Sequence, residues 1–237
     1  MSEYQRDIGR ALAFLNEKPL LRAAALTAFD RGDADIIRQE EDGLLLRARS
    51  FPLVILCADS DRTALELLEA LPACQLMQNE RTGLDEAISA RYGFSWKTPV
   101  NNAVYEKKSP VAVDPGFEVR PLSMADYPLV RAHYSLIGDE ALARHMARGD
   151  LLGGYAGDEM VGFIGRHDEG SLGMLYIFPR FRRRGYAWQL EGSLINRVLA
   201  GGERVFCQVI LGNEASLALQ RKLGMTVCGD VVSWLGK

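Results

Sequence analysis

Residues 176–187 read YIFPRFRRRGYA, and this stretch decides how the sequence is interpreted. An apolar strand pattern runs into a proline, then into a basic loop with one glycine, and then into an amphipathic helix expected over 184–200. The first amides of a helix have no partner within the helix, and the helix dipole favours negative charge beside them. Gly185 lets a phosphate approach the backbone, and the arginines at 182–184 add positive charge. The stretch predicts an anion-binding loop between a strand and a helix.

Two other interpretations of the basic run are a solvated turn and a contact with nucleic acid. The formal net charge of −3 and the isoelectric point near 5.7 weigh against a nucleic-acid binder, as does the lack of a second basic cluster. The sequence has neither GxxxxGK[ST] nor GxGxxG, so neither a nucleoside triphosphate loop nor a dinucleotide site is indicated. We therefore expect no nucleic-acid partner.

The second half of the chain alternates strand and helix patterns around this loop. Strands are expected at 117–120, 151–155, 161–166, 172–178, 205–211 and 227–235, and helices at 126–136, 138–149, 184–200 and 213–223.

The first half shows a related order of elements. Helices are expected at 3–16, 20–29, 62–71 and 84–92, and strands at 35–38, 44–48, 53–57, 74–77 and 100–105. Residues 109–116 hold two prolines and a glycine and are interpreted as a linker. The echo between the halves predicts a duplicated α/β (α+β) fold, with tandem domains over 1–108 and 117–237.

Two motifs in the second half resemble those of the GNAT superfamily of acetyltransferases. The first is Arg/Gln-x-x-Gly-x-Gly/Ala after the fourth strand, matched by Arg182, Gly185 and Ala187. The second is Asn-x-x-Ser on a helix that ends in Lys-Leu-Gly-Phe, matched by Asn213 and Ser216, with Met225 in place of Phe. The resemblance covers 117–237, and it implies that each of the tandem domains is a mixed, mostly antiparallel twisted sheet flanked by helices. The first half is similar to a degenerate copy, and the tandem order is distantly similar to the glycine N-acyltransferase branch.

The resemblance implies an N-acyltransferase that moves an acetyl or other acyl group from acetyl-CoA to an amine on a small molecule or peptide, by direct attack in a ternary complex. It implies that the pyrophosphate lies on the loop, that the pantetheine arm runs beside the preceding strand, and that a splay after that strand exposes an amide to the thioester oxygen. The residues so implied in acetyl-CoA binding are Leu175, Tyr176, Ile177, Arg182, Arg183, Arg184, Gly185, Tyr186, Ala187, Asn213 and Ser216. From the residues alone, Asn213 is equally well explained as a helix N-cap.

The first half lacks this loop. Its corresponding junction, 58–63, has no glycine and carries acidic residues where phosphates would lie. We therefore expect one acetyl-CoA site per chain.

Two positions depart from the family pattern. Gly173 stands where the family often has a Glu that deprotonates the amine, and Gln220 stands where it often has a Tyr that protonates the leaving thiolate. An amine must lose a proton before it attacks, so some base is needed. The candidates are the turn at 167–169, which is also typical of a solvated turn, and His133 and Tyr134, which also suit packing. No catalytic residue is assigned.

The alternative function is a catalytically weak protein that only binds acyl-CoA, as a sensor or interaction protein.

Composition bounds the remaining properties. The four cysteines form no CxxC pair and no histidine lies at zinc-ligand spacing, so we expect reduced, buried thiols and no metal. The longest apolar run, 52–58, is far shorter than the roughly 20 residues of a membrane helix, and the N-terminus has no apolar signal core. We expect a cytoplasmic protein that does not bind membranes and is a monomer or homodimer.

Overall fold

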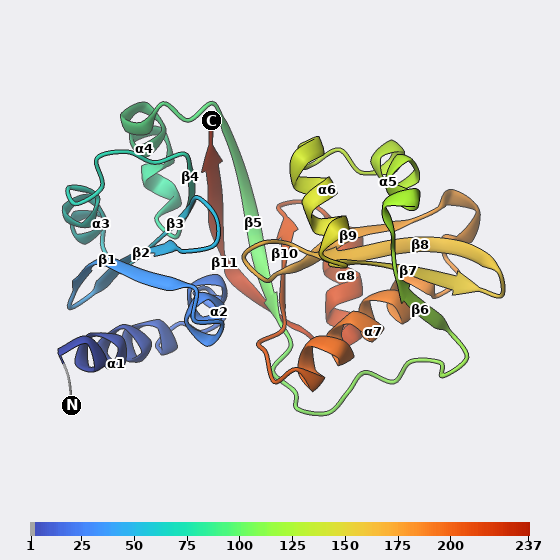
Figure 1. The fold of residues 1–237 in the computed structure, drawn as a ribbon. Coiled ribbons are helices and arrows are strands. Elements are labelled where there is room, and N and C mark those ends of the chain that lie inside the picture. Colours follow the sequence, from blue (N-terminus) through green and yellow to red (C-terminus); the bar gives the residue numbers. More distant parts are fainter. Residues whose placement is uncertain (1–2) are drawn as a thin grey trace. The chain divides into compact units, whose positions relative to one another are not determined.

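A computed structural model describes residues 3–237 of the chain, with the side chains from residue 5 onward (Figure 1). The chain divides into two compact units. Unit 1 comprises 1–104, 208–217 and 226–237, and unit 2 comprises 105–207 and 218–225. The late segments in unit 1 give a division different from a single linker at 109–116, so the predicted domain boundaries stay a prediction.

Unit 1 is built on a mixed sheet in the order β1-β2-β3-β4-β11-β5. Only β3 and β4 are parallel among these pairs, because α3 carries the chain from the end of one to the start of the other. The strands are β1 (Ala34–Glu40), β2 (Gly43–Ala48), β3 (Leu53–Ala58), β4 (Leu76–Asn79), β11 (Thr226–Gly236) and β5 (Trp96–Val104).

Helices cover this sheet and close two apolar clusters. Ala64, Leu67 and Ile88 from α3 and α4 pack with strand residues such as Leu56 and Met77. A smaller cluster joins Leu21, Val100 and Val232. The helices of unit 1 are α1 (Glu3–Asn16), α2 (Ala23–Asp30), α3 (Asp61–Leu68) and α4 (Asp85–Tyr92), with a short 3₁₀ turn η1 (Thr82–Leu84).

Unit 2 is built on the strands β10, β9, β8, β7 and β6, in that order. The pairs β9/β8, β8/β7 and β7/β6 are antiparallel, whereas β10 and β9 are parallel across the helix α7. The strands are β6 (Glu118–Pro121), β7 (Leu151–Ala156), β8 (Glu159–Arg166), β9 (Leu172–Ile177) and β10 (Phe206–Ile210). The residues of β10 from Gln208 onward belong to unit 1.

The helices of unit 2 lie on both faces of its strands (Figure 1). Val130, Leu142 and Met146 from α5 and α6 pack on Phe163 and Met174. Leu190 of α7 packs against Gly154 of β7. A Cβ atom on Gly154 would lie 3.0 Å from the Leu190 side chain. The elements are α5 (Tyr127–His133), α6 (Asp139–Ala147), α7 (Tyr186–Ala200) and α8 (Glu214–Leu223), with the turns η2 (Met124–Asp126) and η3 (Pro179–Phe181). Residues 218–223 of α8 count with unit 2.

The same run of elements occurs twice in the chain. β3-α3-β4-α4 of unit 1 corresponds to β9-α7-β10-α8, a run that starts in unit 2 and of which 208–217 belong to unit 1. Each run has a parallel strand pair joined by its crossover helix. This repeat, with mostly antiparallel pairing elsewhere, confirms the predicted α/β (α+β) fold class. Within 3–237, the helices are all too short or too polar to cross a bilayer.

Candidate functional site: the β9–α7 junction

Strand β9 is paired fully on one side only. Its antiparallel register with β8 runs from Leu172 to Ile177. Its parallel register with β10 is limited to Leu172 and Cys207 within the described chain. The backbone from Gly173 onward is therefore not held by β10, which is the arrangement that the predicted splay requires.

A bulge interrupts β9 on the side of β8. Between the pairs Gly165–Gly173 and Phe163–Tyr176, β9 carries one residue more than β8. Met174 absorbs this extra residue with φ 55°, a left-handed conformation that costs a non-glycine residue about 1–2 kcal/mol. Bulges re-aim backbone groups and side chains next to functional sites. The sequence analysis did not predict this bulge.

The loop after β9 presents a run of unpaired backbone amides. Arg183 has φ 60° and Gly185 has φ 87°, and left-handed residues in such a turn bring successive N–H groups to one side, where they bind anions. None of the amides of 183–188 donates a hydrogen bond within the described chain, and no side chain caps α7. A Cβ on Gly185 would have no atom within 4 Å, so the space in front of the loop is open.

The arginines around the loop differ in their contacts. Arg180 forms an ion pair with Glu159, and Arg182 donates from Nε to the Ile177 carbonyl at 2.9 Å. Arg184 lies over the Phe181 ring, 6.0 Å from its centroid. Arg183 has no ion-pair or hydrogen-bond partner within 3–237. Neither Arg183 nor Arg184 forms an ion pair with a carboxylate in the described residues, so their positive charges are available to a ligand.

Tyr186 fixes the start of α7 by packing. Its ring stacks on Phe117 at 5.9 Å and meets Phe181 edge-on at 5.9 Å. Its backbone amide and that of Ala187 belong to the run of unpaired amides at 183–188.

The segment predicted as a linker is tied to α7. Trp188 Nε1 donates to the Ala112 carbonyl at 3.0 Å, Gln189 accepts from the Asp114 amide at 2.8 Å, and Asn196 bonds both backbone groups of Val111. These bonds hold the helix that carries the loop.

The remaining predicted binding residues lie on β9 and α8. Leu175, Tyr176 and Ile177 lie on the part of β9 that β10 leaves unpaired. Asn213 accepts a hydrogen bond from the Ser216 amide at 3.1 Å, so it is an N-cap of α8. Asn213 and Ser216 belong to unit 1.

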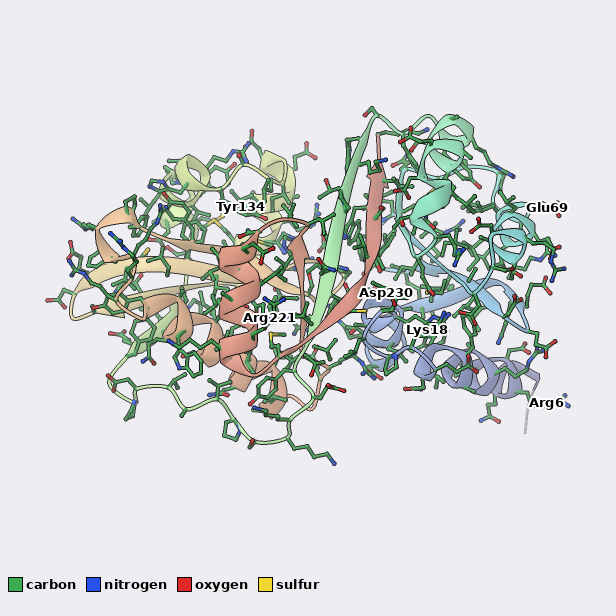
Figure 2. The ribbon with its side chains drawn as sticks, turned by 180° about the vertical axis from the view of Figure 1, so that it is seen from behind. Arg6, Lys18, Glu69, Tyr134, Arg221 and Asp230 are labelled. Atoms are coloured by element: carbon green, nitrogen blue, oxygen red, sulfur yellow. The ribbon has the colours of Figure 1, made fainter. Side chains whose placement is uncertain are left out.

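The candidate bases from the sequence lie in different surroundings. His133 is exposed, and its ring stacks on Tyr176 with centroids 4.7 Å apart. Tyr134, labelled in Figure 2 where α5 ends, is buried, and burial with the nearby Glu169 charge raises its pKa to about 12. Burial acts to raise the Asp168 pKa, but the hydrogen bonds and charges of Arg148, His145 and Arg144 together outweigh it and lower that pKa.

Gln220 is buried and paired with a buried acid that the sequence analysis missed. Glu191 of α7 is 3% exposed, and burial raises its pKa to about 7, although a hydrogen bond with Gln220 opposes this rise. One oxygen of each side chain, Glu191 Oε2 and Gln220 Oε1, has no partner within the described chain. A single Glu on an apolar helix face gives no signal of this pairing in the sequence.

We expect Glu191→Gln to stabilise the protein only at higher pH. The pKa of Glu191 is raised from 4.5 to about 7 on folding, so the stability it contributes is complete below pH 4.5 and is lost as the pH rises to 7. Glutamine removes this loss, which amounts to about 3 kcal/mol. Urea unfolding at pH 4.5 should show no gain and at pH 8 a gain of that order. An equal change at both values would contradict the assignment.

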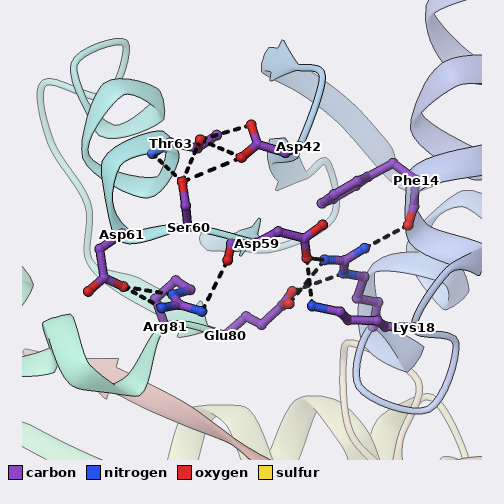
Figure 3. A network of polar contacts seen from close by, with 10 residues as sticks. Phe14, Lys18, Asp42, Asp59, Ser60, Asp61, Thr63, Glu80 and Arg81 are labelled. Atoms are coloured by element: carbon purple, nitrogen blue, oxygen red, sulfur yellow. Dashed lines mark hydrogen bonds and ion pairs between the residues drawn. The ribbon is translucent and has the colours of Figure 1, made fainter.

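The corresponding junction of unit 1 is closed by its own side chains (Figure 3). Ser60 caps α3 by accepting from the Thr63 amide at 3.1 Å. Asp59 is occupied by Lys18 at 2.6 Å and by Arg22 at 2.5 Å. The helix start that is open in unit 2 is therefore capped and surrounded by paired charges here.

Comparison with known proteins identifies the fold. Residues 152–235 match the model of the FR47-like protein family, which is GNAT-related. No curated protein matches the sequence significantly. The X-ray structure of a Drosophila protein is similar with a TM-score of 0.68 at 18% identity, covering 99% of this chain and 96% of that one.

Two GNAT structures are also similar over most of the chain. A putative acetyltransferase of the GNAT family from Novosphingobium aromaticivorans has a TM-score of 0.52 at 16% identity, covering 92% of this chain and 95% of that one. A GCN5-related N-acetyltransferase-like protein from Streptococcus suis has 0.51 at 13%, covering 95% and 99%. The resemblance to the GNAT superfamily is confirmed at the level of the fold.

Proposed function

We propose that this protein transfers an acyl group from acetyl-CoA to an amine. The observation that carries the proposal is the run of unpaired amides at 183–188, in front of open space and beside a strand with one free edge. The fold likeness supports the same reaction class. Acetyl-CoA supplies an acyl group activated as a thioester.

Different residues of the junction bind different parts of acetyl-CoA. In this proposal the amides of Gly185, Tyr186 and Ala187, with the charges of Arg183 and Arg184, hold the pyrophosphate. The free edge of β9 at 175–177 pairs with the pantetheine arm. An amide at the Met174 bulge stabilises the oxyanion that forms when the amine attacks. Holding both reactants in one complex supplies much of the acceleration.

Binding by unit 2 alone predicts one acetyl-CoA per chain. In unit 1, Ser60 caps the equivalent helix and Asp59 is already paired, so no second site is expected. Isothermal titration calorimetry of the full chain with acetyl-CoA measures the stoichiometry, and two sites per chain would overturn this assignment.

Thiol release from acetyl-CoA in the presence of a panel of primary amines tests the transfer itself. Amine-dependent release of CoA is expected. Binding of acetyl-CoA without release for any amine would support an acyl-CoA sensor instead of an enzyme.

A further inference from the structure

The ring of His167 lies where a side chain on residue 173 would lie, next to the bulge of β9. A Cβ built on Gly173 would overlap the imidazole of His167, with Nε2 as the nearest atom and Cδ2 at 2.6 Å. The ring therefore fills the space that a side chain at 173 would take. It comes from the turn between β8 and β9, whose backbone is closed by a bond from the His167 amide to the Ser171 carbonyl at 2.9 Å.

The ring of His167 is not held by a polar contact with any described residue. His167 is half-buried, and neither of its ring nitrogens has a hydrogen-bond or ion-pair partner in the described part of the chain. His145, by contrast, is 2% exposed and contacts Asp150 at 2.9 Å and Asp168 at 3.6 Å. His133 is occupied in stacking on Tyr176.

The position of His167 along β9 suits the reacting end of acetyl-CoA. Pyrophosphate and thioester lie at opposite ends of the pantetheine arm. If the phosphates lie on the loop that follows β9, an arm beside β9 carries the thioester back toward the start of the strand. Gly173 lies four residues before Ile177, roughly 13 Å at about 3.3 Å per residue. His133, which stacks on Tyr176 and meets Phe178 edge-on, lies at the loop end instead.

We propose that His167 takes the proton of the acceptor amine. The inference rests on the proposed acyl transfer. The ammonium gives one proton to Nε2 of His167, which releases it to solvent. The lone pair of the nitrogen then forms the C–N bond, the C–S bond breaks, and the sulfur leaves with its electron pair. The second surplus proton of the nitrogen ends on that sulfur, so the products are an amide and CoA thiol.

Charged and titratable groups lie on the turn that carries His167 and on the elements that contact the other residues of this turn. They are Arg166, Asp168 and Glu169 on the turn, Arg144, His145 and Arg148 on α6, Tyr134 after α5, and Glu203, which pairs with Arg166.

The test compares His167→Gln with the matched control His133→Gln. In His167→Gln, kcat/KM for a primary alkyl amine should fall by roughly 10²- to 10⁴-fold at pH 7, with the Kd for acetyl-CoA unchanged. The rise of kcat/KM with pH that an imidazole base produces between pH 5 and 8 should disappear. His133→Gln should keep that rise. An unchanged rate and pH profile in folded His167→Gln would overturn the proposal.

Two further measurements separate a base from a merely structural residue. Gly173→Ala should displace the imidazole without changing its chemistry, and the rate should fall with the acetyl-CoA Kd unchanged. Hydroxylamine, whose nitrogen is unprotonated at neutral pH, needs no base, so both variants should lose far less rate with it than with the alkyl amine. Equal losses would contradict the role of His167. A wild-type protein that transfers to no amine would refute the proposed function itself.

Discussion

Gly185→Glu is expected to lower the affinity for acetyl-CoA by at least about 100-fold. The variant places a carboxylate in the open space before the unpaired amides of 183–188, where the pyrophosphate is proposed to lie. At about 5 Å and an effective dielectric constant of about 20, each phosphate charge would repel it by about 3 kcal/mol. About 1.4 kcal/mol changes the affinity tenfold.

The control is Gly185→Gln, which has the same shape without the charge. Both variants carry the strain of a side chain at φ 87°, about 1–2 kcal/mol, so their difference reports the charge alone. Calorimetric titration with acetyl-CoA, after circular dichroism has shown that both are folded, measures the two Kd values. Equal Kd values for the Glu and Gln variants would show that the phosphates do not lie at this loop.

Arg22→Met is expected to lower the free energy of unfolding by about 3–5 kcal/mol. The guanidinium is completely buried, and it contacts Glu80 at 3.0 Å, Asp59 at 2.5 Å and the Phe14 carbonyl at 2.6 Å. Burial opposes its charge, but the hydrogen bond and charge of Glu80 outweigh this and raise the Arg22 pKa. Without Arg22, Glu80 keeps a buried charge that lacks its partner, since its side chain is 5% exposed.

Two control variants separate the buried pair from its surroundings. Arg22→Met with Glu80→Gln removes the stranded charge and should recover the larger part of the loss. Lys18→Met removes the half-exposed partner of Asp59 and should cost only about 0–1 kcal/mol. Urea unfolding gives all three values. If the double variant is no more stable than Arg22→Met, the stranded charge is not the cause.

The order of elements could be predicted because the spacing of apolar residues and the Gly and Pro residues that end elements are local features of the sequence. The helices α1 and α8 and the strands around the loop lie within a few residues of their expected places. Strand β5 begins at Trp96, four residues before the expected 100, because Lys97, Thr98 and Pro99 are held by pairing with the distant β11. A pairing partner so far along the chain leaves no local pattern.

The site could be predicted only where its residues follow one another in the sequence. The basic loop and Gly185 occur together in the sequence and form the open helix start. The Met174 bulge depends on strand register, and the contact of His167 with Gly173 depends on how the turn between β8 and β9 folds back. Neither register nor ring placement can be read from a sequence of residue types.

The position of β11 affects the order in which the protein can fold during synthesis. β11 lies between β4 and β5 in the sheet of unit 1, yet the whole segment 105–225 separates it from β5 in the chain. A ribosome makes the chain from its N-terminus, so β4 and β5 emerge with unpaired edges long before β11. Such edges pair readily with other chains. The first unit therefore completes its sheet late, and chaperones that bind exposed strands would act on this interval of translation.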